Sequence, residues 1–165
     1  MKITNYGFID SQNLNLGIKE LGWDLDFKKF RRYLKEKYHV EKAYLFLGYM
    51  PENQTMYSKL QEYGYILIFK PVLVNQSRKV KGNVDADLVL QAMVDYQEYE
   101  KAVIITSDGD FYCLVKYLYK QGKLEKVISP NQDKCSVLLR KTAKEKLVYM
   151  NNLKAKLEYI RKSTA

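Results

Sequence analysis

Aspartates follow two of the apolar runs in the sequence, at the points where those runs end. Asp10 comes directly after the first run, and Asp108 and Asp110 follow the β-branched run 102–106. Gly109 stands between the two later acids, and we expect it to let the backbone turn tightly so that both carboxylates face inward. If the two runs are parallel strands, their carboxyl ends form one edge of a sheet, where open α/β folds bind ligands. The spacing therefore predicts a cluster of carboxylates at that edge.

A third segment, residues 81–88, adds acids where a helix is expected to begin. Asp85 and Asp87 are two positions apart, which is about 200° around a helix, so both cannot face one site. Asp85 is one residue from Val84 and three from Leu88, the apolar residues that a sheet would bury. We therefore expect Asp85 at the edge of the buried face, where it joins the cluster, and Asp87 in solvent.

Clustered carboxylates favour a divalent cation. Hard ions such as Mg²⁺ and Mn²⁺ take oxygen ligands, and without a cation adjacent carboxylates repel one another or keep protons. Such an ion can acidify a bound water and neutralise charge on phosphorus during phosphodiester cleavage. Asp10 and Asp108 also fit a structural role, because each can cap a helix or form a turn. A calcium loop of the EF-hand kind is excluded, since the twelfth position from Asp108 is Tyr119.

The composition leaves few other routes to catalysis. The only histidine, His39, lies in a charged segment at the expected end of a helix. A zinc site with several histidines is therefore excluded, and a catalytic triad would have to use this one residue. The 165 residues fit one domain. No apolar run approaches the ~20 residues of a membrane span. We expect a soluble, cytoplasmic protein without a signal peptide or membrane partner.

Short apolar runs alternate with segments of helical periodicity along the chain. The expected strands are 3–9, 43–47, 65–69, 102–106, 126–128 and 147–150. The expected helices are 26–38, 53–63, 84–99, 111–120, 135–143 and a lysine-rich terminal helix, 151–162. Strands that alternate with helices indicate right-handed crossovers and a parallel sheet covered by helices on both faces. The expected fold class is therefore α/β.

Three short motifs resemble those of one protein family. Residues 10–14, Asp-Ser-Gln-Asn-Leu, are similar to the opening motif of the NYN domain family, within the PIN-like nuclease superfamily. Residues 81–85, Lys-Gly-Asn-Val-Asp, resemble its second motif with one extra residue, and residues 107–111, Ser-Asp-Gly-Asp-Phe, resemble its third. The motifs occur in the family's order, and the bacterial LabA-like branch is the most similar.

The resemblance implies a PIN-like Rossmannoid three-layer sandwich with a central, mainly parallel sheet, and the chemistry of a metal-dependent ribonuclease. The domain would span residues 1–150, with a basic helix and tail over 151–165 as part of the same domain. The site residues that carry over are Asp10, Asp85, Asp108 and Asp110 as catalytic ligands of Mg²⁺ or Mn²⁺, Asn13 as their polar neighbour, and Ser107 beside the metal or the scissile phosphate. Where the family often has an Ala-Asp pair, this chain has Ala143-Lys144.

The positive charge of the chain is concentrated in its last third. The net charge is +9, and residues 112–165 hold 13 lysines and arginines against 4 acids. A basic surface attracts phosphate backbones, so we expect RNA to bind to residues 112–165 and to the loop 78–81, unless both are plain solvated surface. The loop cations that would grip phosphates are Arg78, Lys79 and Lys81. The later cations that would extend a basic track are Lys134, Arg140, Lys141, Lys144 and Lys146. The choice of RNA over DNA comes from the resemblance.

Three functions are compatible with these residues. The first is a ribonuclease that hydrolyses RNA phosphodiester bonds with Mg²⁺ or Mn²⁺. The second is an inactive or weakly active RNA-binding or regulatory module of the same fold. The third, a phosphoaspartate enzyme acting on small phosphate esters, is disfavoured because Asp10-Ser11-Gln12 lacks the second acid of an Asp-x-Asp start. The sequence does not decide the oligomeric state.

Overall fold

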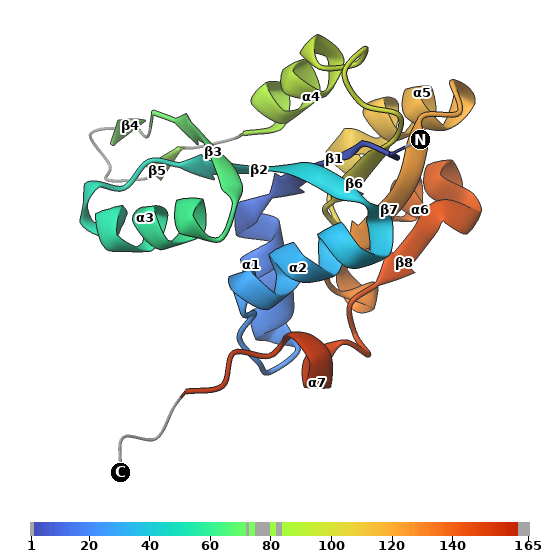
Figure 1. Ribbon diagram of the computed structural model, residues 1–165. Helices are drawn as coiled ribbons and strands as arrows, with labels where there is room; N and C mark the ends of the chain where they lie inside the picture. Colours follow the sequence, from blue (N-terminus) through green and yellow to red (C-terminus); the bar gives the residue numbers. More distant parts are fainter. Residues whose placement is uncertain (1, 72, 75–79, 82–83, 162–165) are drawn as a thin grey trace.

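The structure, a computed structural model, describes residues 2–71, 73–74, 80–81 and 84–161. Within these residues the centre is a sheet of six parallel strands in the order β3-β2-β1-β6-β7-β8 (Figure 1). The strands are β1 (Asn5–Asp10), β2 (Val40–Gly48), β3 (Tyr65–Lys70), β6 (Ala102–Ile105), β7 (Leu124–Ser129) and β8 (Leu147–Tyr149). Each corresponds to a strand expected from the sequence, with bounds that differ by a few residues.

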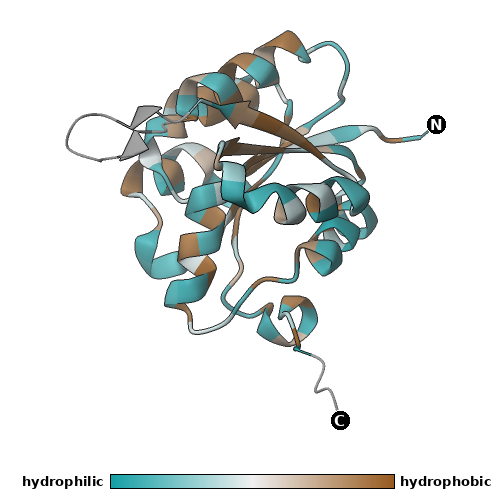
Figure 2. Cartoon of the chain, turned by 90° about the vertical axis from the view of Figure 1, so that its left-hand side faces the viewer, coloured by the Kyte–Doolittle hydropathy of each residue, from teal (hydrophilic) through white to brown (hydrophobic). Residues whose placement is uncertain are grey.

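Helices cover both faces of the sheet and complete the expected three-layer α/β sandwich. On one face pack α1 (Ser11–Glu20), α2 (Phe27–Tyr38) and α3 (Gln54–Glu62). On the other pack α4 (Asp85–Val94), α5 (Tyr112–Lys120) and α6 (Val137–Ala143). Figure 2 shows apolar strands between helix layers that turn many hydrophilic residues outward. The architecture is that of a PIN-like Rossmannoid sandwich.

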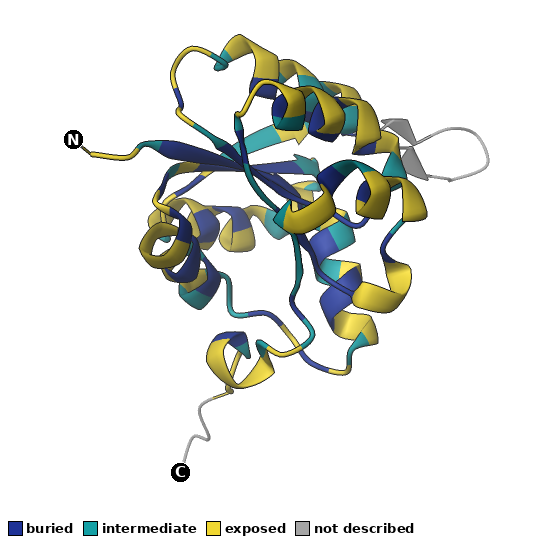
Figure 3. Cartoon of the chain, turned by 90° about the vertical axis from the view of Figure 1, so that its right-hand side faces the viewer, coloured by how far each residue is buried: buried dark blue, intermediate teal, exposed yellow. Residues whose placement is uncertain are grey.

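Alternation of side chains along the strands divides the core in two. In β1, Phe8 contacts the cluster beneath α4, α5 and α6, whereas Ile9 belongs to the cluster beneath α1, α2 and α3. Ile104 and Ile105 of β6 divide in the same way. Because helices cover both faces, apolar residues occupy successive strand positions, as in other buried parallel sheets. Figure 3 shows the strands as the most buried layer, which is why apolar runs located them in the sequence.

The chain changes from one face of the sheet to the other between β3 and β6. Helices on one face join β1, β2 and β3, and the chain then crosses to α4 and returns as β6 beside β1. Right-handed crossovers that run outward from β1 and from β6 leave the carboxyl ends of these two strands uncovered. The residues that follow β1 and β6 therefore lie at the switch point of the strand order, which is the usual position of ligand sites in open α/β sheets.

Two helices differ from the sequence expectation. No helix is expected over residues 11–20, yet α1 forms there and buries Leu14, Gly17 and Ile18, which have helical spacing. The helix expected over 84–99 ends at Val94, because the chain turns and Tyr99 Oη donates to the Ala92 carbonyl at 2.8 Å. The shorter α4 lets Tyr99 pack into the core as a separate anchor.

The expected terminal helix over 151–162 is wrong. Only the single turn α7 (Lys154–Leu157) is helical, and the chain then runs extended beside residues 24–26. Glu158 forms an isolated bridge with Leu25, and the Tyr159 amide donates to the Asp24 carbonyl at 2.8 Å. Pairing with a distant segment therefore replaces the local helical preference. The expected tail over 162–165 lies outside the described residues.

A short antiparallel ribbon leads from β3 towards α4. It consists of β4 (Leu73–Val74) and β5 (Val80–Lys81), and β5 lies within the loop 78–81 expected from the sequence. Turns of 3-10 geometry in the described residues are η1 (Pro51–Asn53), η2 (Gly109–Phe111), η3 (Gln132–Lys134) and η4 (Lys144–Lys146). None of the helices in the described ranges has the length and apolar content that a membrane crossing requires.

Candidate metal centre

Three carboxylates meet at the carboxyl ends of β1 and β6. Asp10 is the last residue of β1, Asp85 is the first residue of α4, and Asp108 lies in the turn after β6. One carboxylate oxygen of each residue lies within 4.8 Å of the other two. Strand ends and helix phase together therefore predicted three side chains that the fold brings to one point.

Asp10 is both a helix cap and a member of the cluster. Its Oδ1 accepts from the Asn13 amide at 3.4 Å and caps α1, while its Oδ2 accepts from Thr106 Oγ1 at 3.3 Å. The residue is only 6% exposed. The two roles considered for Asp10 in the sequence are thus compatible, because a carboxylate oxygen can accept several bonds.

Thr106 connects the first strand end to the second. Its hydroxyl donates to Asp10 and accepts from the Asp108 amide at 3.1 Å. Asp108 in turn caps η2, where its Oδ1 accepts from the Asp110 amide at 2.9 Å. Thr106 is fully buried. Sequence reasoning did not single it out; a hydroxyl at the end of an otherwise aliphatic strand was the available signal.

Asp85 is positioned by the amphipathic start of α4. Val84 and Leu88 are buried on either side of it, which holds its side chain at the edge of the buried face, as the helix phase predicted. A carboxylate in the first turn of a helix is favoured by the unpaired amides and the positive end of the dipole. Asp87, in the same turn, is not part of the carboxylate group within the described residues.

Burial and neighbouring charge disfavour ionisation of Asp10. Loss of hydration raises its pKa from the ordinary 3.8 to about 6, and the nearby carboxylates of Asp85 and Asp108 add to the rise. The hydrogen bonds from the Asn13 amide and the Thr106 hydroxyl act in the opposite direction. The ionised cluster is therefore held together against its own repulsion.

The donor set fits a hard divalent cation. Three carboxylates from separate segments converge, and hard cations such as Mg²⁺ and Mn²⁺ prefer such oxygen ligands. The ion pairs of the described residues, Lys2–Glu41 and Lys134–Glu20, leave Asp10 and Asp108 without a cationic side chain. A bound cation would lie among these carboxylates and offset their negative charge.

Asn13 and Ser107 brace the turn that carries Asp108. Asn13 Oδ1 accepts from the Ser107 amide at 2.8 Å, and the buried Ser107 hydroxyl lies 2.7 Å from the hydroxyl of Ser129. The Ser107 carbonyl accepts from the Ser136 amide at 3.1 Å. These contacts tie α1, β7 and the start of α6 to one turn, so both residues are placed to position the carboxylates.

The remaining predicted site residues are Asp110 and three loop cations, and the structure places only some of them. Asp110 is exposed, and among the described residues the carboxylate group comprises Asp10, Asp85 and Asp108 without it. Lys81 belongs to β5. Arg78 and Lys79 fall outside the described residues.

Gly109 is required for space and not for an unusual backbone conformation. The expected tight turn forms as η2, but the φ of Gly109 is not positive, so the turn does not depend on the conformational freedom of glycine. A Cβ at this position would lie 2.9 Å from the Ser136 Cβ and closer still to its hydroxyl oxygen. Glycine therefore lets the N-terminus of α6 approach the acidic turn.

The chain is similar to known proteins along most of its length. The family model described as the NYN domain matches residues 7–151. The crystal structure of VPA0982, a protein of unknown function from Vibrio parahaemolyticus, covers 92% of this chain and 94% of its own at a TM-score of 0.75 and 20% identity. At that identity the likeness concerns the fold alone. No curated protein matches the chain.

Replacing Asp10 with asparagine should stabilise the metal-free protein and remove its response to metal. The folded state binds the Asp10 proton more tightly than the unfolded state, so metal-free stability falls as pH rises from about 4 to 6, by about 3 kcal/mol at most. In EDTA at pH 8 we expect Asp10→Asn to melt higher, by about 2–4 °C for each kcal/mol regained.

Thermal melts with and without Mn²⁺ across pH 5–8 measure this prediction. Metal stabilisation of the native chain should grow as pH rises through about 6, where Asp10 ionises, and should be absent in Asp10→Asn. The matched control is Asp87→Asn, which should keep the metal response. If Asp10→Asn instead melted lower than the native chain in EDTA at pH 8, the ionised Asp10 carboxylate would not be destabilising the metal-free protein, which would contradict the prediction.

Gly109→Ala should weaken Mn²⁺ binding through its clash with Ser136. Displacement of residues that orient ligands typically lowers metal affinity about 10- to 100-fold. Ser136→Gly removes the clashing atoms, and glycine as N-cap of α6 costs only a few tenths of a kcal/mol. The double variant should therefore recover most of the affinity, measured by calorimetric titration. Equal losses in the single and double variants would show that crowding is not the cause.

Proposed function

Because the chain belongs to the NYN domain family, we propose that it is a divalent-metal-dependent ribonuclease that hydrolyses RNA phosphodiester bonds. The observation that carries the proposal is the convergence of Asp10, Asp85 and Asp108 at the switch point of a parallel sheet. Carboxylates in this arrangement are suited to Mg²⁺ or Mn²⁺ and lie where open α/β sheets usually bind their ligands.

Different residues would have different roles in such a reaction. Mg²⁺ or Mn²⁺ at this site would neutralise charge on the scissile phosphate and lower the pKa of an attacking water. Asp10, Asp85 and Asp108 hold the cation, and the Thr106 hydroxyl favours the ionised form of Asp10. Asp110 lies outside this group and adds negative charge at its exposed rim. Asn13 and Ser107 act as positioning residues.

A groove between α5 and α6 supports RNA as the substrate. It encloses about 540 Å³ and begins at Tyr112, two residues after Asp110, beside Leu138 of α6. Its walls carry four lysines and a second tyrosine, namely Lys116, Lys120, Lys141, Lys144 and Tyr119. Lysines attract a phosphate backbone, and tyrosine rings stack on unpaired bases. A single strand is therefore the form of RNA that this groove suits.

Only some of the cations that the sequence suggested as a basic track line this groove. Lys141 and Lys144 line it, and the Lys144 ammonium lies 5.1 Å from the centre of the Tyr119 ring. Lys134 instead pairs with Glu20 at 3.8 Å, and Arg140 donates to the Gln132 carbonyl at 2.8 Å. We therefore assign the strand-binding role to the cations between α5 and α6.

The same groove also serves the alternative function, RNA binding without cleavage. It would hold a single strand whether or not the carboxylates act on it. We retain the cytoplasm as the proposed location, where RNA and Mg²⁺ are both available to the chain.

Cleavage of labelled RNA with Mn²⁺, Mg²⁺ or EDTA tests the main proposal. We expect cleavage with either ion and none in EDTA. Asp85→Asn and Asp108→Asn should each lower the rate at least about 100-fold, because a metal supplies several kcal/mol of transition-state stabilisation. Asp110→Asn should have a smaller effect.

The matched control for this assay is Asp87→Asn, which changes an acid of the same helical turn and should cut within about twofold of the native rate. Activity that persists in EDTA and in Asp108→Asn would overturn the metal-nuclease proposal. Tight, salt-sensitive RNA binding without cleavage under any condition would favour the binding module.

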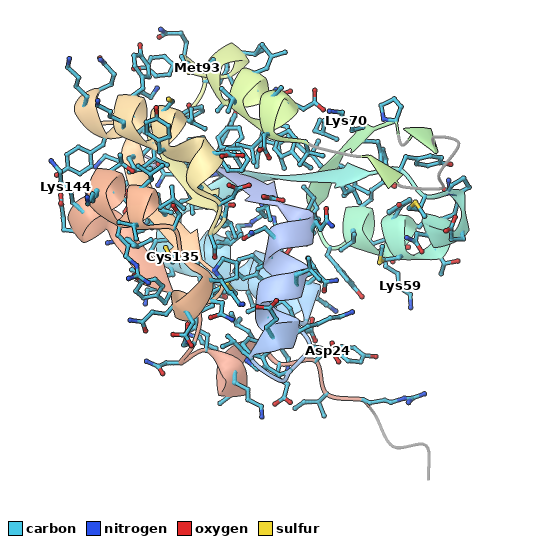
Figure 4. All side chains as sticks on the ribbon, turned by 180° about the vertical axis from the view of Figure 1, so that it is seen from behind. Asp24, Lys59, Lys70, Met93, Cys135 and Lys144 are labelled. Atoms are coloured by element: carbon cyan, nitrogen blue, oxygen red, sulfur yellow. The ribbon has the colours of Figure 1, made fainter. Side chains whose placement is uncertain are left out.

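Neutralising a groove lysine should reduce the salt dependence of RNA binding. Figure 4 shows Lys144 and Lys59 on opposite sides of the molecule. Each phosphate contact with a single strand contributes about −0.7 to the slope of log affinity against log salt. Lys144→Gln should lower the slope by about that amount, and Lys59→Gln should leave it unchanged. Binding of a fluorescent single strand, measured by anisotropy in EDTA, gives both slopes. Equal slopes for the two variants would show that the groove is not part of the surface that binds RNA.

A further inference from the structure

A second hollow lies beside the metal centre, away from the α5–α6 groove. It has a volume of about 370 Å³ and is enclosed by the start of α1, the end of β2, and the segment formed by η1 and α3. The strand order places β2 on one side of β1 and β6 on the other, so the hollow and the groove flank the centre on opposite sides. Figure 1 shows α1 and α3 on the same face of the sheet.

The lining of this hollow carries no charge. Its eleven residues include no acid, lysine, arginine or histidine. A phosphate or carboxylate ligand would lack a cation there, and an amine would lack an anion. The volume is within the range of small-molecule sites, and its predominantly apolar walls with a few polar groups suit a neutral, flat ligand.

Side-chain amides provide the polar groups of the hollow. Gln12 and Asn15 project from α1, and Asn53 projects from the junction of η1 and α3. Within the described residues, no hydrogen bond occupies the side-chain amides of these three. Each amide offers donors and an acceptor at a fixed spacing, which matches the edge of a nucleobase.

The opposite wall is apolar and well fixed. Tyr57 is 4% exposed, and its hydroxyl accepts from the Met50 amide at 3.0 Å and donates to the Gly48 carbonyl at 3.4 Å. The Tyr57 ring also packs against Phe69, with ring centres 4.8 Å apart. Met56, 48% exposed, stands at the hollow with its flexible thioether. Sulfur and aromatic groups of this kind pack well against the face of a base.

The hollow is within reach of the carboxylates. Ser11 and Gln12 line it and directly follow Asp10, and Cα atoms two residues apart are separated by at most about 7.6 Å. A base in the hollow would thus keep its own phosphate near Asp10. The other phosphates of the strand would continue towards the lysines between α5 and α6.

We propose that this hollow binds one unpaired adenine of the RNA next to the scissile phosphate and thereby selects the cleavage position. The proposal rests on the ribonuclease function above. Asparagine and glutamine recognise adenine through a bidentate pair, whereas arginine or lysine reads guanine and an acid reads cytosine. Amides are present in the hollow, and the other two kinds of side chain are absent from its lining.

The test compares single-stranded oligonucleotides that differ at one position, where adenine is replaced by uracil, cytosine or guanine. With Mn²⁺ we expect the adenine strand to be cut at a fixed distance from that base, about tenfold faster than the others, which is the discrimination expected of one bidentate pair. Gln12→Ala and Asn15→Ala should cut all four strands at similar rates. Gln61→Ala, an exposed amide of α3 outside the hollow, should keep the preference.

Equal cutting of the four strands by the native chain, or an adenine preference unchanged in both pocket variants, would overturn the proposal. A guanine preference would overturn the assignment of the base. Anisotropy measurements of strand binding in EDTA separate this inference from the function on which it rests. If the chain cuts no RNA, the nuclease proposal fails, yet tighter binding of the adenine strand that is lost in Asn15→Ala would still support the pocket. Equal binding of the four strands would refute it independently of catalysis.

Discussion

Repulsion between carboxylates is the constraint on which this site depends. Like charges oppose each other most strongly where water is excluded, and Asp10 is almost fully buried. Thr106 counters the repulsion by bonding the Asp10 carboxylate and the Asp108 amide at once. Asn13 and Ser107 fasten the same turn to the surrounding helices and strands. The fold thus holds the acids together, and a divalent cation of the kind we propose would relieve their repulsion.

Three surfaces of different chemistry meet at the carboxyl edge of the sheet. The centre is acidic, the α5–α6 groove carries lysines and tyrosines, and the hollow between α1 and α3 is neutral with amide groups. In the function that we propose, these surfaces would serve the parts of a single RNA strand, since a metal held by carboxylates would bind a phosphate, lysines would attract the backbone and amides would read a base. The lysines that line the α5–α6 groove are therefore separate from the cluster of acids.

The sequence predicted those strands and helices whose buried residues follow a regular spacing along the chain. The run 102–106 identified a buried strand, because helices on both faces demand continuous apolar residues. Helix α1 was missed because serine and asparagines, which favour caps and turns, fill its first half. Its packing depends on a distant contact, where Asn131 donates to the Gly17 carbonyl. The prediction of a terminal helix was wrong for the same reason, because Glu158 pairs with Leu25, which is distant in the sequence.

The sequence by itself determined that Asp10, Asp85 and Asp108 converge, because the ends of parallel strands share one edge and helix phase selects Asp85 over Asp87, but it counted Asp110 with them. Only the tertiary structure separated Asp110 from Asp108, since the directions of two side chains in a 3-10 turn follow from how that turn is anchored. It also decided the role of Thr106, whose hydroxyl links two strand ends that are far apart in the chain. Strand alternation and helix periodicity act over a few residues and can be read from a sequence. Contacts between elements depend on the packing of the whole domain, and such contacts fix the acids and form the neutral hollow beside them.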